Sequence, residues 1–439
     1  MNMVDLIMKK RNGEVLSQAE INFFITEYVQ DRIPDYQAAA LLMAIWFRGM
    51  DKRETGELTV AMTDSGDKID LSAIHGIKVD KHSTGGVGDK TTLIIVPIVA
   101  ACGVPVAKLS GRSLGHTGGT IDKLESIPGI STSLTIDDFI RQVQEIGLAL
   151  AGQTANLAPA DKKLYALRDV TATVDQLSLI ASSIMSKKLA SGADKIVLDV
   201  KTGSGAFMKT VDEAVELAKA MVDIADHAGK ETIALVTDMD RPLGRMIGNS
   251  LEVEEALAVL RGEGPVDLIE VCNLLAANML YLAGQGSLSE CADLAKEAVS
   301  SGRALEKFAL MIAAQGGDAD YIRGHKQLER AGKVHDITAP ISGYIHYVET
   351  DDLGKAAGLL GAARLQKDTE IDHQSGIILH KTLGDYVVQG EPLVSLLYNK
   401  TNSLDEACNL ALYAFEIKES PAEPRPVLLA RVTANSIER

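Results

Sequence analysis

The sequence predicts an α/β protein in three parts: a helical domain, an α/β domain with a mainly parallel sheet across a cleft, and a C-terminal α+β domain. The first 66 residues carry helix-start signals and no strand pattern. Between residues 77 and 283, short apolar runs rich in β-branched residues alternate with helical stretches, which is typical of strands buried in a parallel sheet. After residue 334, short strands follow one another, with Gly-Asp and Gly-Glu turns between them.

The composition limits the functions that are possible. The chain has 439 residues, enough for two or three domains, and 46% of them are hydrophobic. Its net charge of −16 and its aromatic content of 4% argue against binding to nucleic acid or to an anionic membrane. The four cysteines are far apart, and no apolar run approaches the roughly 20 residues that a membrane span needs. We therefore expect a cytoplasmic protein with free thiols.

The helical domain is predicted from its helix caps. Ser17 and Glu20 form a capping box for a helix that ends near residue 30. Pro34 opens a second helix that Gly49 ends, and Asp51 caps a third. Two helical stretches within 160–191 are expected to rejoin this bundle, so the domain comprises residues 1–66 and 160–192. One of its apolar faces is a candidate subunit interface.

The other two domains are predicted from their strands. In the α/β domain, 70–158 and 193–334, strands are expected from residue 77 and at 104–109, 148–150, 196–200 and 232–236. Its helices are expected at about 89–102, from about 137, and at 211–228, 251–261 and 265–283. In such a fold, ligands bind at the carboxyl ends of the strands. The C-terminal domain, 335–439, is predicted from strands at 344–348, 377–380 and 393–397.

Two glycine-rich loops follow predicted strands and indicate a phosphate site. The first spans residues 80–89 (Asp-Lys-His-Ser-Thr-Gly-Gly-Val-Gly-Asp), and the second spans 110–120 (Ser-Gly-Arg-Ser-Leu-Gly-His-Thr-Gly-Gly-Thr). Glycines let main-chain N–H groups approach an anion, and the lysine, serine and threonine side chains add positive charge and hydroxyl donors. The first loop resembles a nucleoside-triphosphate loop, but Asp89 interrupts the required Gly-Lys-Ser/Thr. We therefore expect a phosphorylated or phosphate-using substrate.

A second cluster of polar residues lies between positions 161 and 187. Tyr165 and Arg168 are three apart on one predicted helix, and Ser183 and Lys187 are four apart on the next, so each pair shares a helix face. Alone, these residues are most simply a solvated basic face. Beside a phosphate site, they suggest recognition of a polar heterocycle that becomes anionic. In the first loop, His82 is favoured as a functional residue whose pKa is lowered by nearby cations.

Residues 110–125 match the pattern Ser-Gly-Arg-Gly/Ala-Leu-Gly-x-x-Gly-Gly-Thr-x-Asp-Lys-x-Glu, with Ser113 as the one departure. Together with residues 81–89, 161–163, 168–173 and 203–208, this pattern makes the chain resemble the pyrimidine-nucleoside phosphorylases over essentially its full length. The resemblance implies a homodimer and a reversible phosphorolysis that converts a pyrimidine nucleoside and phosphate into the free base and a pentose 1-phosphate. Lys108 is similar to the residue in members with broad specificity, so uridine, thymidine and deoxyuridine are the expected substrates.

The resemblance also implies roles for individual residues. Phosphate, the co-substrate, would be bound by Lys81, His82, Ser83, Thr92, Lys108, Leu109, Ser110 and Thr120. The nucleoside would be bound by Leu114, Tyr165, Arg168, Ser183 and Lys187. Arg168 and Lys187 would stabilise the negative charge on the departing base, and His82 would interact with it or protonate it. No organic cofactor is implied.

One potassium ion is implied as well, held at positions Gly88, Lys90, Leu243, Met246 and Glu255. Lys90 stands where the resemblance leads us to expect a threonine hydroxyl. A charged lysine only donates hydrogen bonds and cannot ligate a cation. We therefore hypothesise that the Lys90 ammonium replaces the potassium ion and pairs with Glu255.

Three alternatives remain open at this stage. The chain could be a thymidine-specific phosphorylase. It could be a phosphoribosyltransferase of related fold, although the loops are not flanked by the acidic pair that such an enzyme needs for magnesium pyrophosphate. It could also be a non-catalytic dimer that binds nucleosides. Phosphate-dependent release of free base separates a phosphorylase from the last two alternatives, and a comparison of uridine with thymidine tests the first.

Overall fold

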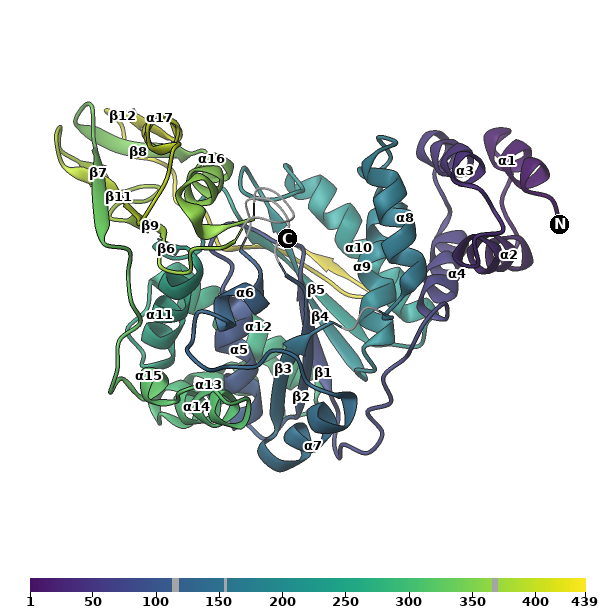
Figure 1. Cartoon of the computed structure of the whole chain (residues 1–439), viewed down its shortest axis with the longest axis horizontal. Helices are drawn as coiled ribbons and strands as arrows, with labels where there is room; N and C mark the ends of the chain where they lie inside the picture. Colours follow the sequence, from purple (N-terminus) through teal and green to yellow (C-terminus); the bar gives the residue numbers. More distant parts are fainter. Residues whose placement is uncertain (113–117, 154–155, 365–369) are drawn as a thin grey trace.

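The computed structural model describes residues 1–112, 118–153, 156–364 and 370–439. Figure 1 shows a helical bundle on the right, an α/β domain in the centre and a C-terminal domain on the upper left. This arrangement confirms the predicted fold class. Within the described residues, no helix combines the length and the apolar character needed to cross a membrane.

The bundle joins two separate parts of the chain. It contains α1 (Met3–Arg11), α2 (Gln18–Val29), α3 (Asp35–Arg48) and α4 (Lys52–Thr63), which pack with α8 (Pro159–Asp169) and α9 (Leu177–Ala190). Leu164 and Leu179 of the later helices share a core with Phe24 and Leu41 of the earlier ones. The capping boxes before α2 and α4 and the end of α3 at Gly49 are also confirmed.

A parallel sheet forms the centre of the molecule. Its parallel strands are β1 (Val79–Ser83), β4 (Lys195–Thr202) and β5 (Thr232–Asp238), paired in that order. A second parallel pair, β2 (Val106–Ser110) and β3 (Leu148–Gly152), lies beside β1 (Figure 1). β1 begins at Val79 rather than at residue 77. β2 begins at Val106 rather than at residue 104, since Pro105 has no N–H to donate to a neighbouring strand.

Helices cover both faces of this sheet. The helices of this domain are α5 (Thr91–Ala101), α6 (Thr120–Leu124), α7 (Ile136–Ile146), α10 (Val211–His227), α11 (Asn249–Leu260), α12 (Val266–Leu282), α13 (Leu288–Ser300), α14 (Arg303–Ala314) and α15 (Asp320–Arg323), and α9 of the bundle also packs on the sheet. α5 and α12 share one core with Val197 and Leu235. α9 and α10 share the other core with Leu198 and Val236. Consecutive residues of β4 and β5 thus point to opposite, equally apolar layers, which explains the apolar runs at 196–198 and 233–236.

The C-terminal domain is built from short strands around a small helical core. Its elements are β7 (Lys333–Thr338), β8 (Gly343–Val348), α16 (Thr350–Ala357), the π-helix η1 (Gly358–Ala362), β9 (Gly376–Leu379), β10 (Tyr386–Val387), β11 (Pro392–Tyr398), α17 (Leu404–Tyr413) and β12 (Phe415–Lys418). β6 (Met246–Ile247), a strand of the preceding domain, pairs with β9. The two domains therefore share a sheet.

The last two strands return to the central sheet. β13 (Leu428–Val432) pairs antiparallel with β5, and β14 (Ile437–Glu438) pairs with β13. The sequence analysis assigned these residues to the C-terminal unit 335–439, whereas in the structure they complete the α/β sheet. Strand partners are set by contacts distant in sequence, so local pattern could not reveal this pairing.

Candidate active site

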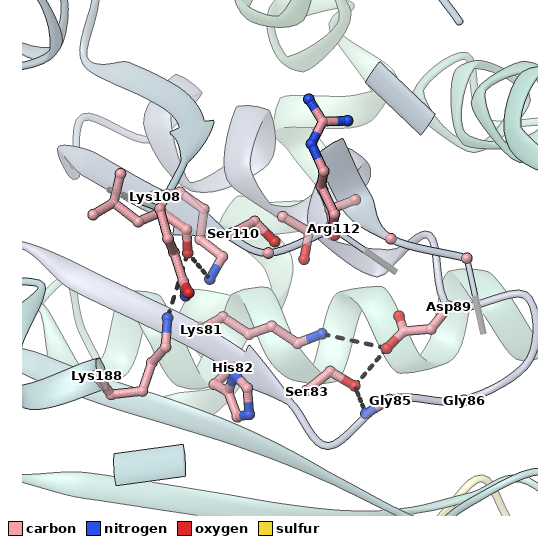
Figure 2. Close-up of a pocket in the computed structure, with 17 residues that line it drawn as sticks. Lys81, His82, Ser83, Gly85, Gly86, Asp89, Lys108, Ser110, Arg112 and Lys188 are labelled. Atoms are coloured by element: carbon pink, nitrogen blue, oxygen red, sulfur yellow. Dashed lines mark hydrogen bonds and ion pairs between the residues drawn. The ribbon is translucent and has the colours of Figure 1, made fainter. Parts of the chain in front are cut away.

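A pocket of about 210 Å³ lies at the carboxyl ends of β1 and β2 (Figure 2). The two glycine-rich loops and the last turn of α9 contribute to it. All eight residues that the sequence analysis assigned to phosphate line this pocket: Lys81, His82, Ser83, Thr92, Lys108, Leu109, Ser110 and Thr120. The structure thus brings all the residues predicted to bind phosphate to one pocket, from segments up to about 40 residues apart in the sequence.

The first glycine loop is held by Asp89. The Asp89 carboxylate accepts hydrogen bonds from the hydroxyls of Ser83 and, at 2.6 Å, Thr91. Gly85, with φ of +94°, donates its N–H to the Ser83 hydroxyl at 3.2 Å. Burial disfavours the charged form of Asp89, but nearby ammonium groups, first that of Lys81, outweigh it and hold the pKa of Asp89 well below its usual range. The residue that breaks the triphosphate motif thus organises this loop as a permanent anion.

Lys81 extends from β1 beneath this loop. Its ammonium donates to the Thr91 hydroxyl at 2.6 Å and lies 3.2 Å from a carboxylate oxygen of Asp199. Asp199 also binds Lys201 at 2.9 Å, and all three charged side chains are at most 1% exposed. This buried cluster holds the Lys81 side chain in place at the pocket, which it lines.

A second buried cluster lies between β1 and β2. The Asp80 carboxylate is shared by Lys108, at 3.2 Å, and Lys188, at 3.0 Å, and all three side chains are at most 4% exposed. The Leu109 carbonyl accepts from Lys108 at 3.2 Å. Burial lowers the pKa of Lys108 to about 7, and the ammonium of Lys188 acts in the same direction against the attraction of Asp80. Lys108 is therefore the lysine of this pocket that changes charge near neutral pH.

His82 carries a neutral imidazole in the pocket. Burial lowers its pKa well below the ordinary value, and the ammonium groups of Lys188, Lys108 and Lys187 add to the effect. The predicted direction is confirmed, although burial rather than the neighbouring cations is the largest cause. A neutral imidazole can donate one hydrogen bond and accept another.

The second glycine loop is described on either side of residues 113–117. Ser110 and Thr120 face the pocket, and Arg112 binds Glu125 through two hydrogen bonds, at 2.5 and 2.6 Å. The same guanidinium donates to Asp122 at 3.1 Å. Leu114, which the sequence analysis assigned to the nucleoside, lies outside the described residues, as does Ser113.

The remaining nucleoside residues do not line this pocket. Arg168 is only 2% exposed, and its guanidinium donates to the main-chain carbonyls of residues 173, 174 and 179. Lys187 forms an ion pair with Asp161 at 2.8 Å. Ser183 is buried on α9, and Tyr165 is 38% exposed on α8. The predicted site is therefore assembled on its phosphate side, with the nucleoside residues on the adjoining helices.

The residues assigned to potassium lie together, next to the pocket rather than in it. The Lys90 ammonium donates to the carbonyls of Leu243, at 3.0 Å, and Met246, at 2.7 Å, and pairs with Glu255. Gly88 lies against the same Leu243 carbonyl. A lysine ammonium thus stands among the oxygens predicted to hold the ion, and a potassium ion does not fit beside it.

Sequence reasoning missed several charged residues of the site. Lys188 lines the pocket, and Asp80 and Asp199 hold its lysines in place. In the sequence, the only signal for Asp80 was its place as the first residue of the glycine loop, and the only signal for Lys188 was that it follows Lys187. Their roles depend on pairing across β1, β2, β4 and α9, which no local spacing reveals.

Comparisons with known proteins place the chain in a class. Family models of glycosyl transferases match it twice, the helical bundle domain over residues 4–66 and the a/b domain over residues 75–305. Among solved structures, an anthranilate phosphoribosyltransferase from Thermus thermophilus is similar, with a TM-score of 0.58, 21% identity, and coverage of 71% of this chain and 99% of that one. This likeness concerns the fold. The chain is thus a glycosyl transferase with a helical bundle and an α/β domain.

The relatives define the family more narrowly. A model described as the pyrimidine nucleoside phosphorylase C-terminal domain matches residues 344–418. The pyrimidine-nucleoside phosphorylase of Geobacillus stearothermophilus is 52% identical over 434 residues, 99% of this chain and 100% of that protein. That of Bacillus subtilis is 55% identical over 403 residues, 92% and 93% of the two chains. The chain belongs to the pyrimidine-nucleoside phosphorylase family.

Proposed function

We propose that the protein catalyses the reversible phosphorolysis of pyrimidine nucleosides, with uridine, thymidine and deoxyuridine as substrates. In this reaction the bond between C1′ and the base breaks, and its electron pair leaves with the base. A bond from an oxygen of the hydrogen phosphate dianion to C1′ forms, and the proton that this phosphate loses ends on the base. The observation that carries the proposal is the convergence of all eight predicted phosphate residues on one pocket. Phosphate serves as co-substrate, without an organic cofactor.

The phosphate side binds and orients the nucleophile. Lys81 supplies charge, Ser83, Thr92, Ser110 and Thr120 supply hydroxyl groups, and the first turn of α5 adds the positive end of a helix dipole. Phosphate is already an anion at neutral pH, so it needs placement beneath C1′ rather than a deprotonating base. Placement of this kind supplies several kcal/mol of the barrier reduction.

The base side stabilises the leaving group. The departing pyrimidine carries negative charge on its oxygens, which Arg168 and Lys187 would neutralise. The neutral imidazole of His82 lines the phosphate pocket, near enough to Lys187 for that ammonium to lower the His82 pKa, and it is able to donate a hydrogen bond to the base. Because Arg168 and Lys187 do not line the phosphate pocket, we propose that the helical and α/β domains close on the substrates. Closure would also exclude water.

The decisive experiment measures uracil and thymine release from uridine and thymidine, each with and without phosphate. Phosphate-dependent release from both is the expected result. Release from thymidine alone would make the enzyme thymidine-specific and would remove the argument from Lys108. Release from neither would favour a phosphoribosyltransferase or a non-catalytic nucleoside-binding protein.

A single hydroxyl tests the position of the phosphate site. Ser110→Ala removes one donor from the pocket without removing a charge. A hydrogen bond to a charged group contributes roughly 1.5–3 kcal/mol, so the KM for phosphate should rise by about tenfold or more. Ser133→Ala, at an exposed serine outside the pocket, is the matched control and should leave the KM unchanged. Equal KM values for both variants would show that phosphate does not bind at Ser110.

We also propose that the protein is a homodimer through its helical domain. Helices α1 and α3 lie at the outer end of the bundle (Figure 1), and both carry exposed apolar side chains. On α3, Tyr36 is 74% exposed and Phe47 is 72% exposed. Light scattering should give twice the mass of one chain, and Phe47→Asp should shift it toward the mass of one chain. An unchanged mass in this variant would place the interface elsewhere.

A further inference from the structure

One buried lysine beside the phosphate pocket has no solvent contact. Lys90 lies between the first glycine loop and α5, and its side chain is 0% exposed. Its ammonium has three oxygen partners: the Leu243 and Met246 carbonyls and the Glu255 carboxylate. An ammonium carries three N–H donors, so these partners match its donors in number. The contacts join residues more than 150 positions apart in the sequence.

The surroundings of this ammonium leave no room for a separate cation. Glu255 also accepts the N–H groups of Arg245, at 2.8 Å, and Met246, at 3.2 Å. A Cβ atom at Gly88 would lie only 2.9 Å from the Leu243 carbonyl oxygen, which the Lys90 ammonium also contacts. The oxygen atoms suited to a monovalent cation are thus already bound to a positive charge that belongs to the chain itself.

The position of Lys90 connects this charge to the phosphate pocket. It directly follows Asp89, whose carboxylate binds Ser83 and Thr91. Its main-chain N–H also donates to the Gly88 carbonyl at 2.9 Å. Holding the side chain of Lys90 therefore fixes the end of the glycine loop and the carboxylate that orients its hydroxyls.

We propose that Lys90 is a built-in cation, which replaces the potassium ion implied for this family and positions the first glycine loop, so that the enzyme works without any monovalent metal ion. The proposal rests on the proposed phosphorolysis and deepens it. Lys90 is a positioning residue, because it acts on phosphate through Asp89 and Ser83. It follows that removal of the ammonium opens a site lined by oxygens, to which potassium can bind.

The first test compares cations on the wild-type enzyme. Uridine phosphorolysis is measured in buffers of equal ionic strength that contain either potassium or tetramethylammonium. Equal kcat and equal KM for phosphate in both buffers are expected. Activity that depends on potassium would overturn the inference while leaving the proposed function intact. A folded wild-type enzyme that is inactive in both buffers would overturn the proposed function itself.

The second test converts the built-in cation into a metal dependence. Lys90→Thr places a short hydroxyl beside the three vacated oxygens. In tetramethylammonium, its KM for phosphate should rise and its kcat should fall by at least about tenfold in combination, and potassium should restore them in a saturable manner. Lys90→Met, which offers no oxygen ligand, should show the loss with weaker restoration. Lys90→Thr that keeps full activity in tetramethylammonium would refute the role of Lys90.

Thermal unfolding supplies a readout that does not depend on activity. Potassium should raise the Tm of Lys90→Thr and leave the wild-type Tm unchanged, relative to tetramethylammonium. Lys10→Thr is the matched control, because Lys10 also forms a buried ion pair with a glutamate, Glu54, at 2.8 Å, but far from the pocket. Its Tm should fall without any response to potassium. An equal potassium response in both variants would show a general salt effect and overturn the inference.

Discussion

Replacement of Lys188 by methionine is expected to shift the pH dependence of phosphate binding upward. Lys188 and Lys108 share the buried Asp80 carboxylate, at 3.0 and 3.2 Å. Burial lowers the pKa of Lys108 to about 7, and the neighbouring Lys188 ammonium contributes to this lowering. In the wild type, Lys108 therefore loses its proton near neutral pH. Above that pH the pocket has one positive charge less to attract phosphate.

The size of the shift follows from the repulsion that is removed. Two like charges 4 Å apart repel by about 4 kcal/mol at an effective dielectric constant of about 20. One pKa unit corresponds to about 1.4 kcal/mol. Without Lys188, Asp80 is paired with Lys108 alone, so the pKa of Lys108 should rise by at least about one unit. The KM for phosphate, which should begin to rise above about pH 7 in the wild type, should begin to rise only at a higher pH in Lys188→Met.

The assay is the KM for phosphate in uridine phosphorolysis, measured from acidic to alkaline pH for the wild type and two variants. The ionisation of phosphate itself is common to all three proteins and cancels in the comparison. Lys108→Met should lack the pH-dependent rise that Lys108 causes. A rise at the same pH in the wild type and in Lys188→Met would refute the reasoning. So would a rise that persists in Lys108→Met.

Three further predictions concern the framework around the pocket. Asp199→Asn leaves two fully buried lysines without their carboxylate and should lower the free energy of unfolding by about 3 kcal/mol or more, measured by urea denaturation. Gly88→Ala, at a φ of +75° with a carbonyl 2.9 Å from the new Cβ atom, should destabilise more than Gly85→Ala, at a φ of +94° with open space. Equal losses of unfolding free energy in the two variants would show that the close carbonyl at Gly88 has no steric effect. Arg364→Ala removes a 3.0 Å ion pair to the buried Asp122, next to the second glycine loop. Because the Arg364 side chain is 26% exposed, the KM for phosphate should rise only about fivefold. An unchanged KM would show that this contact from the C-terminal domain does not support phosphate binding.

The fold was largely predictable because its signals are local. The capping boxes at Ser17 and Asp51 mark helix starts directly, and both appear in the structure. The apolar strands at 196–200 and 232–236 have no polar face, which requires burial on both sides. The pairing of β13 with β5 was not predictable, because a five-residue strand carries no information about a partner almost 200 positions away.

The glycine loops were predictable for the same reason, since a run of glycines with lysine, serine and threonine carries its chemistry in one segment. The supporting charges were not. Asp80 lies on β1 and pairs with Lys108 of β2 and Lys188 of α9, and Asp199 lies on β4 and pairs with Lys81 of β1 as well as with its near neighbour Lys201. Lys90 illustrates what the sequence can and cannot predict. A lysine at this position indicates that an ammonium replaces an ion, but only the structure shows which oxygens the ammonium binds.

The paired charges explain how a chain with a net charge of −16 offers a site for an anion. Asp80 is shared by two lysines, Lys108 and Lys188, and Asp199 is shared by Lys81 and Lys201. With both of its lysines protonated, the Asp80 cluster carries one excess positive charge, whereas Lys81 and Lys201 are balanced by Asp199 and by Asp89, 4.0 Å from Lys81. An unpaired buried lysine would lose its proton instead, because burial disfavours the charged form. Asp80 thus opposes the loss of charge that burial favours at Lys108, and lysines gather at the pocket even though the whole molecule is acidic.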